Sequence, residues 1–205
     1  RSIVMMTRLF DIIFSFIILI ILLPLFLLFA LVIILTSKGG VFYLQKRVGK
    51  DGKIFSLIKF RTMFVNADKQ GLLTVGNDKR ITKFGKFLRK YKLDELPQFL
   101  NVLIGQMSIV GPRPEVPKYV DLYNQEQKKV LSVKPGITDY ASLLYFNESN
   151  ELVRSSEPEK HYINVIMPHK INLSLEYIEN KSLWFDIKII FWTFLRIVGI
   201  KYKIK

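Results

Sequence analysis

The sequence has 205 residues, of which 50% are hydrophobic, and a formal net charge of +14. This composition excludes intrinsic disorder, and the length is that of about one domain. A charge this positive points to a polyanionic partner such as nucleic acid, phospholipid headgroups or phosphorylated substrates. Because the chain has no Cys and only two His, disulfides, thiolate zinc sites and Cys nucleophiles are excluded, and histidine-rich metal sites are disfavoured.

The first predicted element is an apolar segment long enough to cross a bilayer. From Leu9 to Leu35 the only charged residue is Asp11, and about 20 apolar residues suffice to span a membrane. A secretory signal peptide fits poorly, because its apolar core is roughly 7 to 15 residues long and a small-residue cleavage site follows it. We therefore expect residues 1–37 to hold the protein in a membrane.

Pro24 and the basic flanks bear on how this segment enters the membrane. Pro24 removes one backbone hydrogen bond, which predicts a kink near the middle. Lys and Arg occur on both sides of the segment, whereas the positive-inside rule expects asymmetric flanks for one straight span. A re-entrant helical hairpin, with both ends on one face, would satisfy the flanks. A kinked span stays open from these residues, since prolines are tolerated in spanning helices.

Residues 41–60 predict a β-hairpin, because two apolar runs flank the turn sequence Gly49-Lys50-Asp51-Gly52. Residues 79–92 follow with seven Lys or Arg and no acidic residue. Apolar residues recur among these cations at helical spacing, which predicts an amphipathic helix at the membrane interface. A solvated basic face over an ordinary core stripe is the alternative.

The C-terminal part repeats this pattern. Residues 183–195 are rich in aliphatic and aromatic side chains, and Lys201, Lys203 and Lys205 follow them. Trp and Lys favour the headgroup region of anionic membranes, so we expect a second interfacial helix, with a core helix as the alternative.

No repeat or Gly/Ser-rich linker divides residues 38–205. We expect an α+β fold in which residues 1–37 form the membrane anchor. Residues 38–205 are expected to form a small, mostly helical catalytic domain with a β-hairpin and interfacial amphipathic helices.

Two adjacent carboxylates, Asp94 and Glu95, directly follow the basic stretch. Pro97 is favoured in the first turn of a helix, so a helix is predicted to start near Asp94. At such a terminus the helix dipole and free N–H groups would keep Asp94 ionised and let a phosphate bind beside it. An ordinary Asp N-cap followed by Glu is the structural alternative.

A stiff arginine turn and a basic strand end add to this signal. In Gly111-Pro112-Arg113-Pro114 the prolines fix the backbone around Arg113, whose planar guanidinium suits bidentate contact with phosphate. Lys59 and Arg61 add two cations at the end of a predicted strand. Each feature alone could be an exposed turn or strand end, but together they suggest phosphoryl transfer in a basic membrane protein.

The chain resembles the bacterial sugar transferases called monotopic phosphoglycosyl transferases over nearly its whole length. Five segments carry the resemblance, in this order: the Pro24-broken apolar segment, Lys59-Phe60-Arg61-Thr62-Met63, Asp94-Glu95-Leu96-Pro97-Gln98, Gly111-Pro112-Arg113-Pro114 and Lys134-Pro135-Gly136-Ile137-Thr138. Two positions depart from many members of the family. Leu23 stands where they have Ser, and Asp139 stands where they have Gly.

The resemblance implies an activity, a location and a mechanism. The activity is transfer of a sugar 1-phosphate from a UDP-sugar to undecaprenyl phosphate with release of UMP, the first membrane step of glycoconjugate synthesis. The location is the bacterial inner membrane, with the catalytic domain on the cytoplasmic face and the anchor re-entrant at Pro24. Partners would be the two substrates and anionic phospholipid, without nucleic acid, and the resemblance is compatible with a homodimer.

Residue roles follow from the same resemblance. Asp94 would be the nucleophile of a ping-pong mechanism through a covalent aspartyl phosphosugar, and Glu95 the ligand of the cofactor Mg²⁺. Arg113 would contact substrate phosphate, and Lys59 and Arg61 match the basic strand end of the family.

Other interpretations of the sequence stay open. A non-catalytic protein that binds anionic lipid would explain the charge and the apolar segments, but it would leave the carboxylate pair and the proline-braced Arg113 without a role. Nucleic-acid binding would explain the charge, although no known reading motif is present. Within the enzyme interpretation, Glu95 as nucleophile with Asp94 on the metal is the rival assignment.

Overall fold

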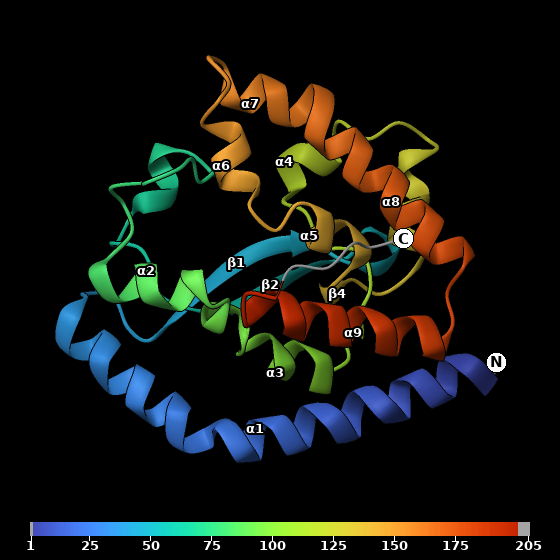
Figure 1. Ribbon diagram of the computed structural model, residues 1–205, viewed down its shortest axis with the longest axis horizontal. Coiled ribbons are helices and arrows are strands. Elements are labelled where there is room, and N and C mark those ends of the chain that lie inside the picture. Colours follow the sequence, from blue (N-terminus) through green and yellow to red (C-terminus); the bar gives the residue numbers. More distant parts are fainter. Residues whose placement is uncertain (1, 201–205) are drawn as a thin grey trace.

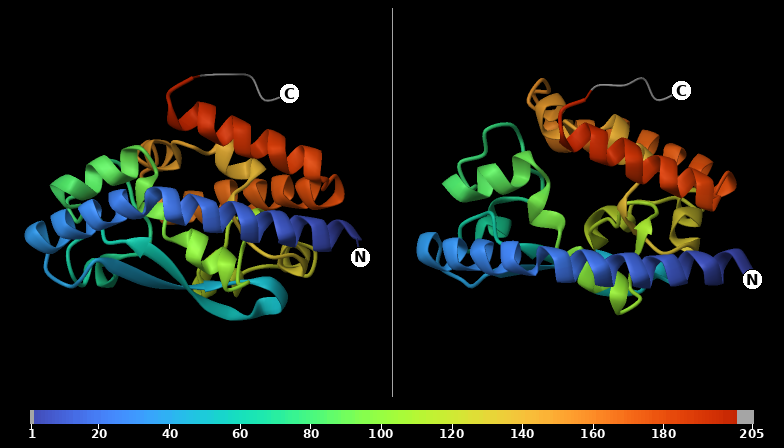
Figure 2. Two further views of the ribbon diagram at one scale, coloured as in Figure 1. Left: turned by 90° about the horizontal axis from the view of Figure 1, so that it is seen from below. Right: turned by 60° about the horizontal axis from the view of Figure 1, so that its bottom comes forward.

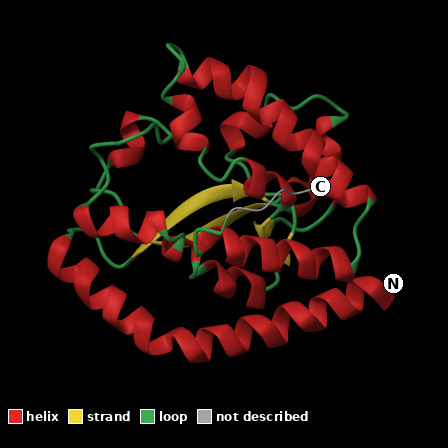
Figure 3. Cartoon of the chain, in the orientation of Figure 1, coloured by secondary structure: helices red, strands yellow, loops and turns green. Residues whose placement is uncertain are grey.

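The computed structural model describes residues 2–200, which form a mixed, mostly helical molecule around a small amount of sheet (Figure 1, Figure 3). This confirms the predicted combination of helices and strands. The elements are α1 Ser2–Thr36, β1 Phe42–Val48, β2 Ile54–Phe60, α2 Lys83–Lys90, α3 Gln98–Leu103, β3 Ser108–Val110, α4 Pro117–Val120, β4 Gly136–Thr138, α5 Tyr140–Leu144, α6 Glu148–Leu152, α7 Pro158–His161, α8 Met167–Glu179 and α9 Leu183–Ile197.

Helix α1 contains the whole apolar segment from Leu9 to Leu35 and continues through Pro24. It bends near its middle and runs along one side of the molecule (Figure 1, Figure 2). The predicted turn between two helices is not seen, since the loss of one hydrogen bond at Pro24 leaves the helix continuous. Residues Met5–Thr36 are long and apolar enough to cross a membrane by length and composition. A re-entrant path through a membrane stays a prediction.

One face of α1 packs against the rest of the chain. Near the N-terminus this face is polar: Asp11 and Ser15 are buried, and the Arg8 guanidinium donates to the carbonyl oxygens at the end of α3. Further along, Phe29 and Ile33 are buried together with Phe60 of β2. The side chains on the opposite face of α1 are apolar and exposed, so α1 is both part of the core and an apolar outer surface.

The β-hairpin is confirmed. Strands β1 and β2 pair antiparallel, with Phe42 opposite Phe60 and Val48 opposite Ile54. In the turn, Asp51 and Gly52 have φ values of 56° and 74°, and left-handed backbone of this kind favours Gly and Asp. Helices α4 to α8 lie on the side of this hairpin away from α1 (Figure 1).

The basic helix is shorter than predicted. Helix α2 begins at Lys83 because the Thr82 hydroxyl caps it, accepting a hydrogen bond from the Gly85 N–H at 2.9 Å. Leu88 is fully buried and Phe87 is half exposed, as an amphipathic helix requires. The residues before Thr82 belong to a loop in which Arg80 pairs with Asp78 at 2.6 Å.

Helix α9 also has two faces. Ile189 is fully buried, whereas Trp184, Phe191 and Phe194 are exposed. The predicted core and interfacial interpretations therefore each describe one face of this helix. The predicted cations Lys201, Lys203 and Lys205 lie outside the described residues.

The short parallel pair of β3 and β4 fixes the start of the arginine turn. Ser108 lies opposite Gly136, and Val110 lies opposite Thr138. A Cβ atom added at Gly111 would lie 2.5 Å from the Lys134 carbonyl oxygen, so only glycine allows the two backbones to approach this closely. The motifs that contain Arg113 and Gly136 are therefore neighbours in space.

Candidate active site

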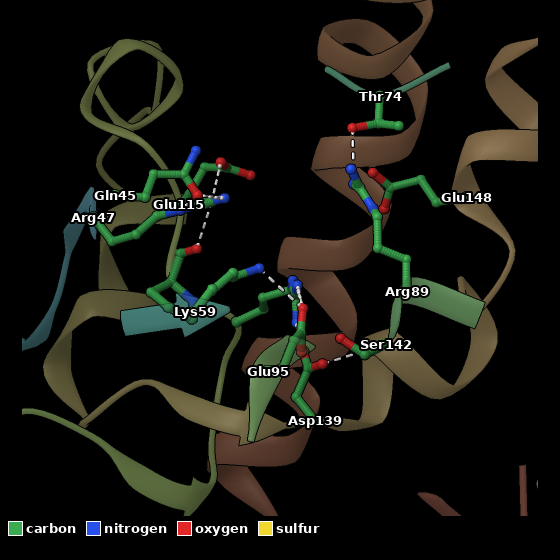
Figure 4. A network of polar contacts seen from close by, with 12 residues as sticks. Gln45, Arg47, Lys59, Thr74, Arg89, Glu95, Glu115, Asp139, Ser142 and Glu148 are labelled. Carbon is green, nitrogen blue, oxygen red and sulfur yellow. Dashed lines mark hydrogen bonds and ion pairs between the residues drawn. The ribbon is translucent and has the colours of Figure 1, made fainter. Parts of the chain in front are cut away.

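The two carboxylates lie in a short 3-10 turn, Leu93–Glu95, that follows Lys92 in a left-handed conformation with φ 56°. The predicted α-helix at Asp94 is wrong in its starting point, because α3 begins only at Gln98 with Pro97 before it. The turn directs the Glu95 side chain toward β2 and the arginine turn (Figure 4).

Glu95 is held by two cations from different parts of the chain. Lys59, near the end of β2, places its Nζ 3.0 Å from Glu95 Oε1. Arg113 forms a two-pronged pair, with Nη1 3.2 Å from Glu95 Oε2 and Nη2 bonded to Glu95 Oε1. The structure thus brings together three of the residues that the sequence predicts for the site.

These contacts determine the protonation of Glu95. Burial opposes ionisation, but the charges of Arg113 and Lys59 outweigh it and hold the pKa of the Glu95 carboxyl well below its ordinary value. In return, Glu95 raises the pKa of Arg113. Burial lowers the pKa of Lys59 despite the nearby carboxylates.

Asp94 is in a different environment. It is 6% exposed, and no other residue of the described chain donates a hydrogen bond to its carboxyl group. Burial and the adjacent Glu95 charge raise the pKa of Asp94, against the opposing effect of Lys59, Arg89 and Lys92. Burial therefore has the largest effect on the pKa of Asp94, and the predicted helix dipole does not determine it.

Arg61 lines the same cavity as the other predicted site residues but bonds to the backbone of the α1–β1 connection instead of to Glu95. Its Nε donates to the Gly40 carbonyl oxygen at 3.0 Å, and its Nη2 donates to the Phe42 carbonyl oxygen at 3.1 Å. Arg61 therefore fastens the connection between α1 and β1. Strand β2 ends at Phe60, so Arg61 lies just beyond the regular strand.

A second polar cluster braces the arginine turn and was not predicted. Arg47 of β1 donates from Nη1 to the Pro114 carbonyl oxygen at 2.9 Å and to Glu115 Oε1 at 3.0 Å. The Tyr162 hydroxyl donates to the other oxygen of Glu115. Since Arg113 directly precedes this cluster, the cluster fixes the backbone from which Arg113 reaches Glu95. Only proximity in sequence to Arg113 could have pointed to Glu115.

A cavity of about 900 Å³ connects these groups. Asp94, Glu95 and Arg113 line it, and so do Phe14, Ile18 and Leu22 of α1. The cavity therefore joins a charged region to apolar side chains of α1. Figure 4 shows Lys59 and Glu95 in the middle of the polar region, with Arg47 and Glu115 to one side and Arg89 and Glu148 to the other.

The donor set is compatible with a magnesium ion but does not form a complete protein cage. No cluster of three or more Asp, Glu, His or Cys side chains that could hold a metal occurs within residues 2–200. Mg²⁺ is commonly held by one or two carboxylates together with substrate phosphates. Asp94 and Glu95 supply such oxygens, provided that a bound phosphate draws Lys59 and Arg113 away from Glu95.

Comparisons with known proteins agree with the motifs. A family model described as bacterial sugar transferase matches residues 3–199. The chain is 42% identical over 190 residues to the UDP-glucose:undecaprenyl-phosphate glucose-1-phosphate transferase of Klebsiella pneumoniae, an alignment that covers 91% of this chain and 38% of the relative.

Two further relatives extend this result. A UDP-N-acetylgalactosamine-undecaprenyl-phosphate N-acetylgalactosaminephosphotransferase of Aeromonas hydrophila is 38% identical over 174 residues, which are 83% of this chain and 38% of the relative. An uncharacterized sugar transferase of Bacillus subtilis (strain 168) is 37% identical over 173 residues, which are 84% of this chain and 77% of the relative. The chain thus spans 38% of the length of the first two relatives. With a family match over nearly its whole length, the chain belongs to the bacterial sugar transferases.

Proposed function

We propose that this chain transfers a sugar 1-phosphate from a UDP-sugar to undecaprenyl phosphate and releases UMP. The observation that carries this proposal is the single cavity that joins the buried carboxylates Asp94 and Glu95 to the apolar side chains of α1. A soluble, charged donor and a lipid acceptor both need access to one reacting centre, and such a cavity has a region suited to each. The names of the Klebsiella and Aeromonas relatives describe the same two substrate classes.

In the first half-reaction an Asp94 oxygen attacks the phosphorus that carries the sugar. An Asp–O–P bond forms, the bond from that phosphorus to the bridging oxygen breaks, and UMP leaves with the electron pair. Negative charge gathers on the phosphoryl oxygens during this step, and Arg113 and Lys59 lie where they can stabilise it. Their pairing with Glu95 keeps both cations in place before the donor binds.

In the second half-reaction an oxygen of the lipid phosphate attacks the same phosphorus. The bond from phosphorus to Asp94 breaks, the carboxylate is restored, and the sugar is left on a lipid diphosphate. An acyl phosphate is an activated leaving group, so covalent catalysis lets the two substrates use one site in turn. This division suits a pair of substrates that enter from water and from the membrane.

The contacts of the two carboxylates favour Asp94 over Glu95 as nucleophile. Both oxygens of Glu95 accept hydrogen bonds from cations, whereas Asp94 accepts none from the described residues. The raised pKa of Asp94 also makes its carboxylate the more basic of the pair. Basicity and a free lone pair are properties of the better nucleophile.

Glu95 is also the residue that we propose as the protein ligand of a Mg²⁺ ion bound with the substrate. Such an ion would neutralise the phosphate charge of the donor and act as a Lewis acid. Lys59 and Arg113 would then bind phosphoryl oxygens, as their position around the same cavity allows.

We further propose that the chain lies in the bacterial inner membrane with its cavity open to the cytoplasmic side. Apolar side chains are exposed along α1, in and just after α3, and on the outer face of α9, among them Leu31, Ile104 and Trp184. Exposed apolar surface of this extent marks a site of membrane contact. A net charge of +14 favours anionic headgroups.

A coupled assay for UMP release tests the proposed function. Purified protein in lipid nanodiscs should release many equivalents of UMP from a UDP-sugar when undecaprenyl phosphate is in excess and at most one equivalent without it, and Asp94→Asn should abolish both. Asp121→Asn is the matched control, because Asp121 is exposed outside the cavity. Binding to anionic vesicles without release of UMP from any UDP-sugar would instead identify a non-catalytic lipid-binding protein.

A further inference from the structure

Six consecutive residues between the end of α5 and the first turn of α6 line the cavity: Tyr145, Phe146, Asn147, Glu148, Ser149 and Asn150. Glu148 is the only acidic residue of this segment. The segment follows Asp139, at which the chain departs from many family members. Its composition combines aromatic rings, amides, a hydroxyl and a carboxylate. Pyranose rings present both apolar C–H faces and hydroxyl groups, which these side chains complement.

The carboxylate in this wall is fixed in place. Lys170 of α8 places its Nζ 2.6 Å from Glu148 Oε2, and the two side chains are 14% and 26% exposed, respectively. A pair this sheltered orients both partners and leaves the second oxygen of Glu148 to accept other hydrogen bonds. A carboxylate accepts hydrogen bonds and donates none when it is ionised.

The neighbouring aromatic ring is fixed as well. Phe146 lies between two cations, with Lys92 Nζ 4.9 Å and Arg196 Cζ 5.5 Å from its ring centroid. Lys92 directly precedes the turn that carries Asp94. The wall formed by residues 145–150 is therefore attached to the reacting centre through Lys92.

The position of Glu148 suits a group bonded to the reacting phosphate. Figure 4 shows Glu148 and Arg89 on one side of Glu95, across from Arg47 and Glu115. Glu148 and Arg113 line the same cavity. A phosphate at Arg113 would thus have its substituent within the part of the cavity that residues 145–150 enclose.

We propose that residues 145–150 bind the sugar of the donor and that Glu148 accepts hydrogen bonds from its hydroxyl groups, so that Glu148 determines which sugar is transferred. This inference rests on the proposed function. Uracil has one N–H and two carbonyl oxygens, so a carboxylate that only accepts matches the base poorly, whereas the hydroxyl groups of the sugar are donors. The ribose of UMP also has two hydroxyl donors, and the inhibition constant of UMP measured below distinguishes them from the hydroxyl groups of the sugar. Because the sugar stays on the phosphorus through both half-reactions, its binding region must also be separate from the one that UMP vacates.

The test compares donors that differ in one hydroxyl group. Glu148→Gln keeps the shape and a hydrogen-bond acceptor for Lys170, and it replaces one acceptor oxygen by a donor. We expect the ratio of kcat/KM for UDP-glucose to that for UDP-galactose to change roughly 10- to 100-fold, the worth of a hydrogen bond to a charged group. The inhibition constant of UMP should stay the same.

Glu126→Gln is the matched control. It is the same substitution in a Glu that pairs with a Lys, at 2.7 Å from Lys129 Nζ, but this pair is exposed and lies outside the cavity. It should leave both the donor ratio and the affinity for UMP unchanged. Glu148→Asp, which keeps the charge but withdraws it by one methylene, should change the donor ratio in part.

Three results would overturn the inference. A uniform loss for all donors would make Glu148 a structural residue, and weaker inhibition by UMP would place it against the nucleotide. An unchanged donor ratio would remove it from the sugar region. If the parent protein turned over no donor, the proposed function would fail separately. Calorimetry would then still compare UDP-sugar with UDP, and Glu148→Gln should weaken only the former.

Discussion

Asp94 and Glu95 are adjacent in the chain, yet their surroundings shift the pKa values of their carboxyl groups in opposite directions. The difference arises because Glu95 points at Lys59 and Arg113, while Asp94 is buried beside the Glu95 charge. The sequence alone could place both residues in one site, but it could not show which of the two carboxyl groups is paired with cations. Both roles depend on which cations the fold delivers from β2 and from the arginine turn.

The first prediction concerns Asp94 and stability. A carboxyl group whose pKa rises on folding binds its proton more tightly in the folded state, so its ionisation above the ordinary value of 3.8 costs folding free energy. Asp94→Asn removes that cost and should raise the melting temperature at neutral pH while turnover is lost. The gain should shrink as the pH falls toward 3.8. A variant less stable than the parent at neutral pH would contradict the assigned pKa direction; Asp121→Asn serves as the exposed control.

The second prediction has the opposite sign. The lowered pKa of Glu95 stabilises the folded state at every pH above the ordinary value of 4.5, and this stability is lost as the pH falls through the lower folded-state value. Glu95→Gln leaves Lys59 and Arg113 without their counter-charge. The free energy of unfolding at neutral pH should drop by about 3 kcal/mol, measured by denaturant titration in detergent. An unchanged value would mean that the two cations find other partners.

At the scale of elements, one turn of α1 holds both segments that carry the site. Arg8 donates to the Val102 and Leu103 carbonyl oxygens at 2.6 and 2.9 Å, at the end of α3. Asp11 Oδ1 accepts a hydrogen bond from the Ile109 N–H at 3.0 Å, in β3. Helix α3 follows the carboxylate turn, and β3 leads to the arginine turn. Helix α1 is thus bonded to the connection between them.

The third prediction tests this fastening. Asp11→Leu makes α1 more apolar, so association with vesicles should be at least as strong as in the parent. The Ile109 N–H loses its acceptor, which should lower the free energy of unfolding by about 1–3 kcal/mol. Asp11→Asn keeps an acceptor oxygen, so its free energy of unfolding should be close to that of the parent. Ile13→Leu is the neutral control, because the Ile13 side chain is 50% exposed. If Asp11→Leu were as stable as the parent, the docking role of Asp11 would be wrong.

The elements differ in how far sequence could predict them. The hairpin at 41–60 and the helix from Leu183 follow from local patterns and were predicted almost to their ends, whereas α2 covers only the middle of the predicted basic stretch. The helix predicted to start near Asp94 begins as a 3-10 turn at Leu93–Glu95 and becomes α-helical only from Gln98, a difference that the local pattern does not reveal. Asp11 stood out as the lone charge in its segment, but its partner Ile109 is distant in sequence and only the tertiary structure identifies it.

At the scale of the whole molecule, α1 has two faces. One packs against the segments that carry the candidate site, and the other is apolar and exposed. Helix α1 bends but stays continuous (Figure 1). The path that it would take through a membrane therefore depends on the bilayer as well as on the chain. Basic residues on both sides of α1 favour both ends on the cytoplasmic face. Assembly into homodimers stays a prediction from the family resemblance.

The fourth prediction concerns topology. Cysteines introduced singly at Ser2 and at Ser37 in this Cys-free chain should both react only with reagents that reach the cytoplasm. Pro24→Ala should straighten α1 and favour a full span, since it restores the missing backbone hydrogen bond. Labelling of either cysteine only from the periplasmic side in the parent protein would rule out the re-entrant topology.

The central claim is that Asp94 forms a covalent phosphosugar, and one measurement tests it most directly. The protein is incubated with a UDP-sugar and no acceptor, then analysed by intact-protein and peptide mass spectrometry. The account predicts one equivalent of UMP and a sugar-phosphate adduct on Asp94, absent from Asp94→Asn and discharged by undecaprenyl phosphate. An adduct on Glu95, or release of UMP only when acceptor is present with kinetics that require a ternary complex, would contradict it.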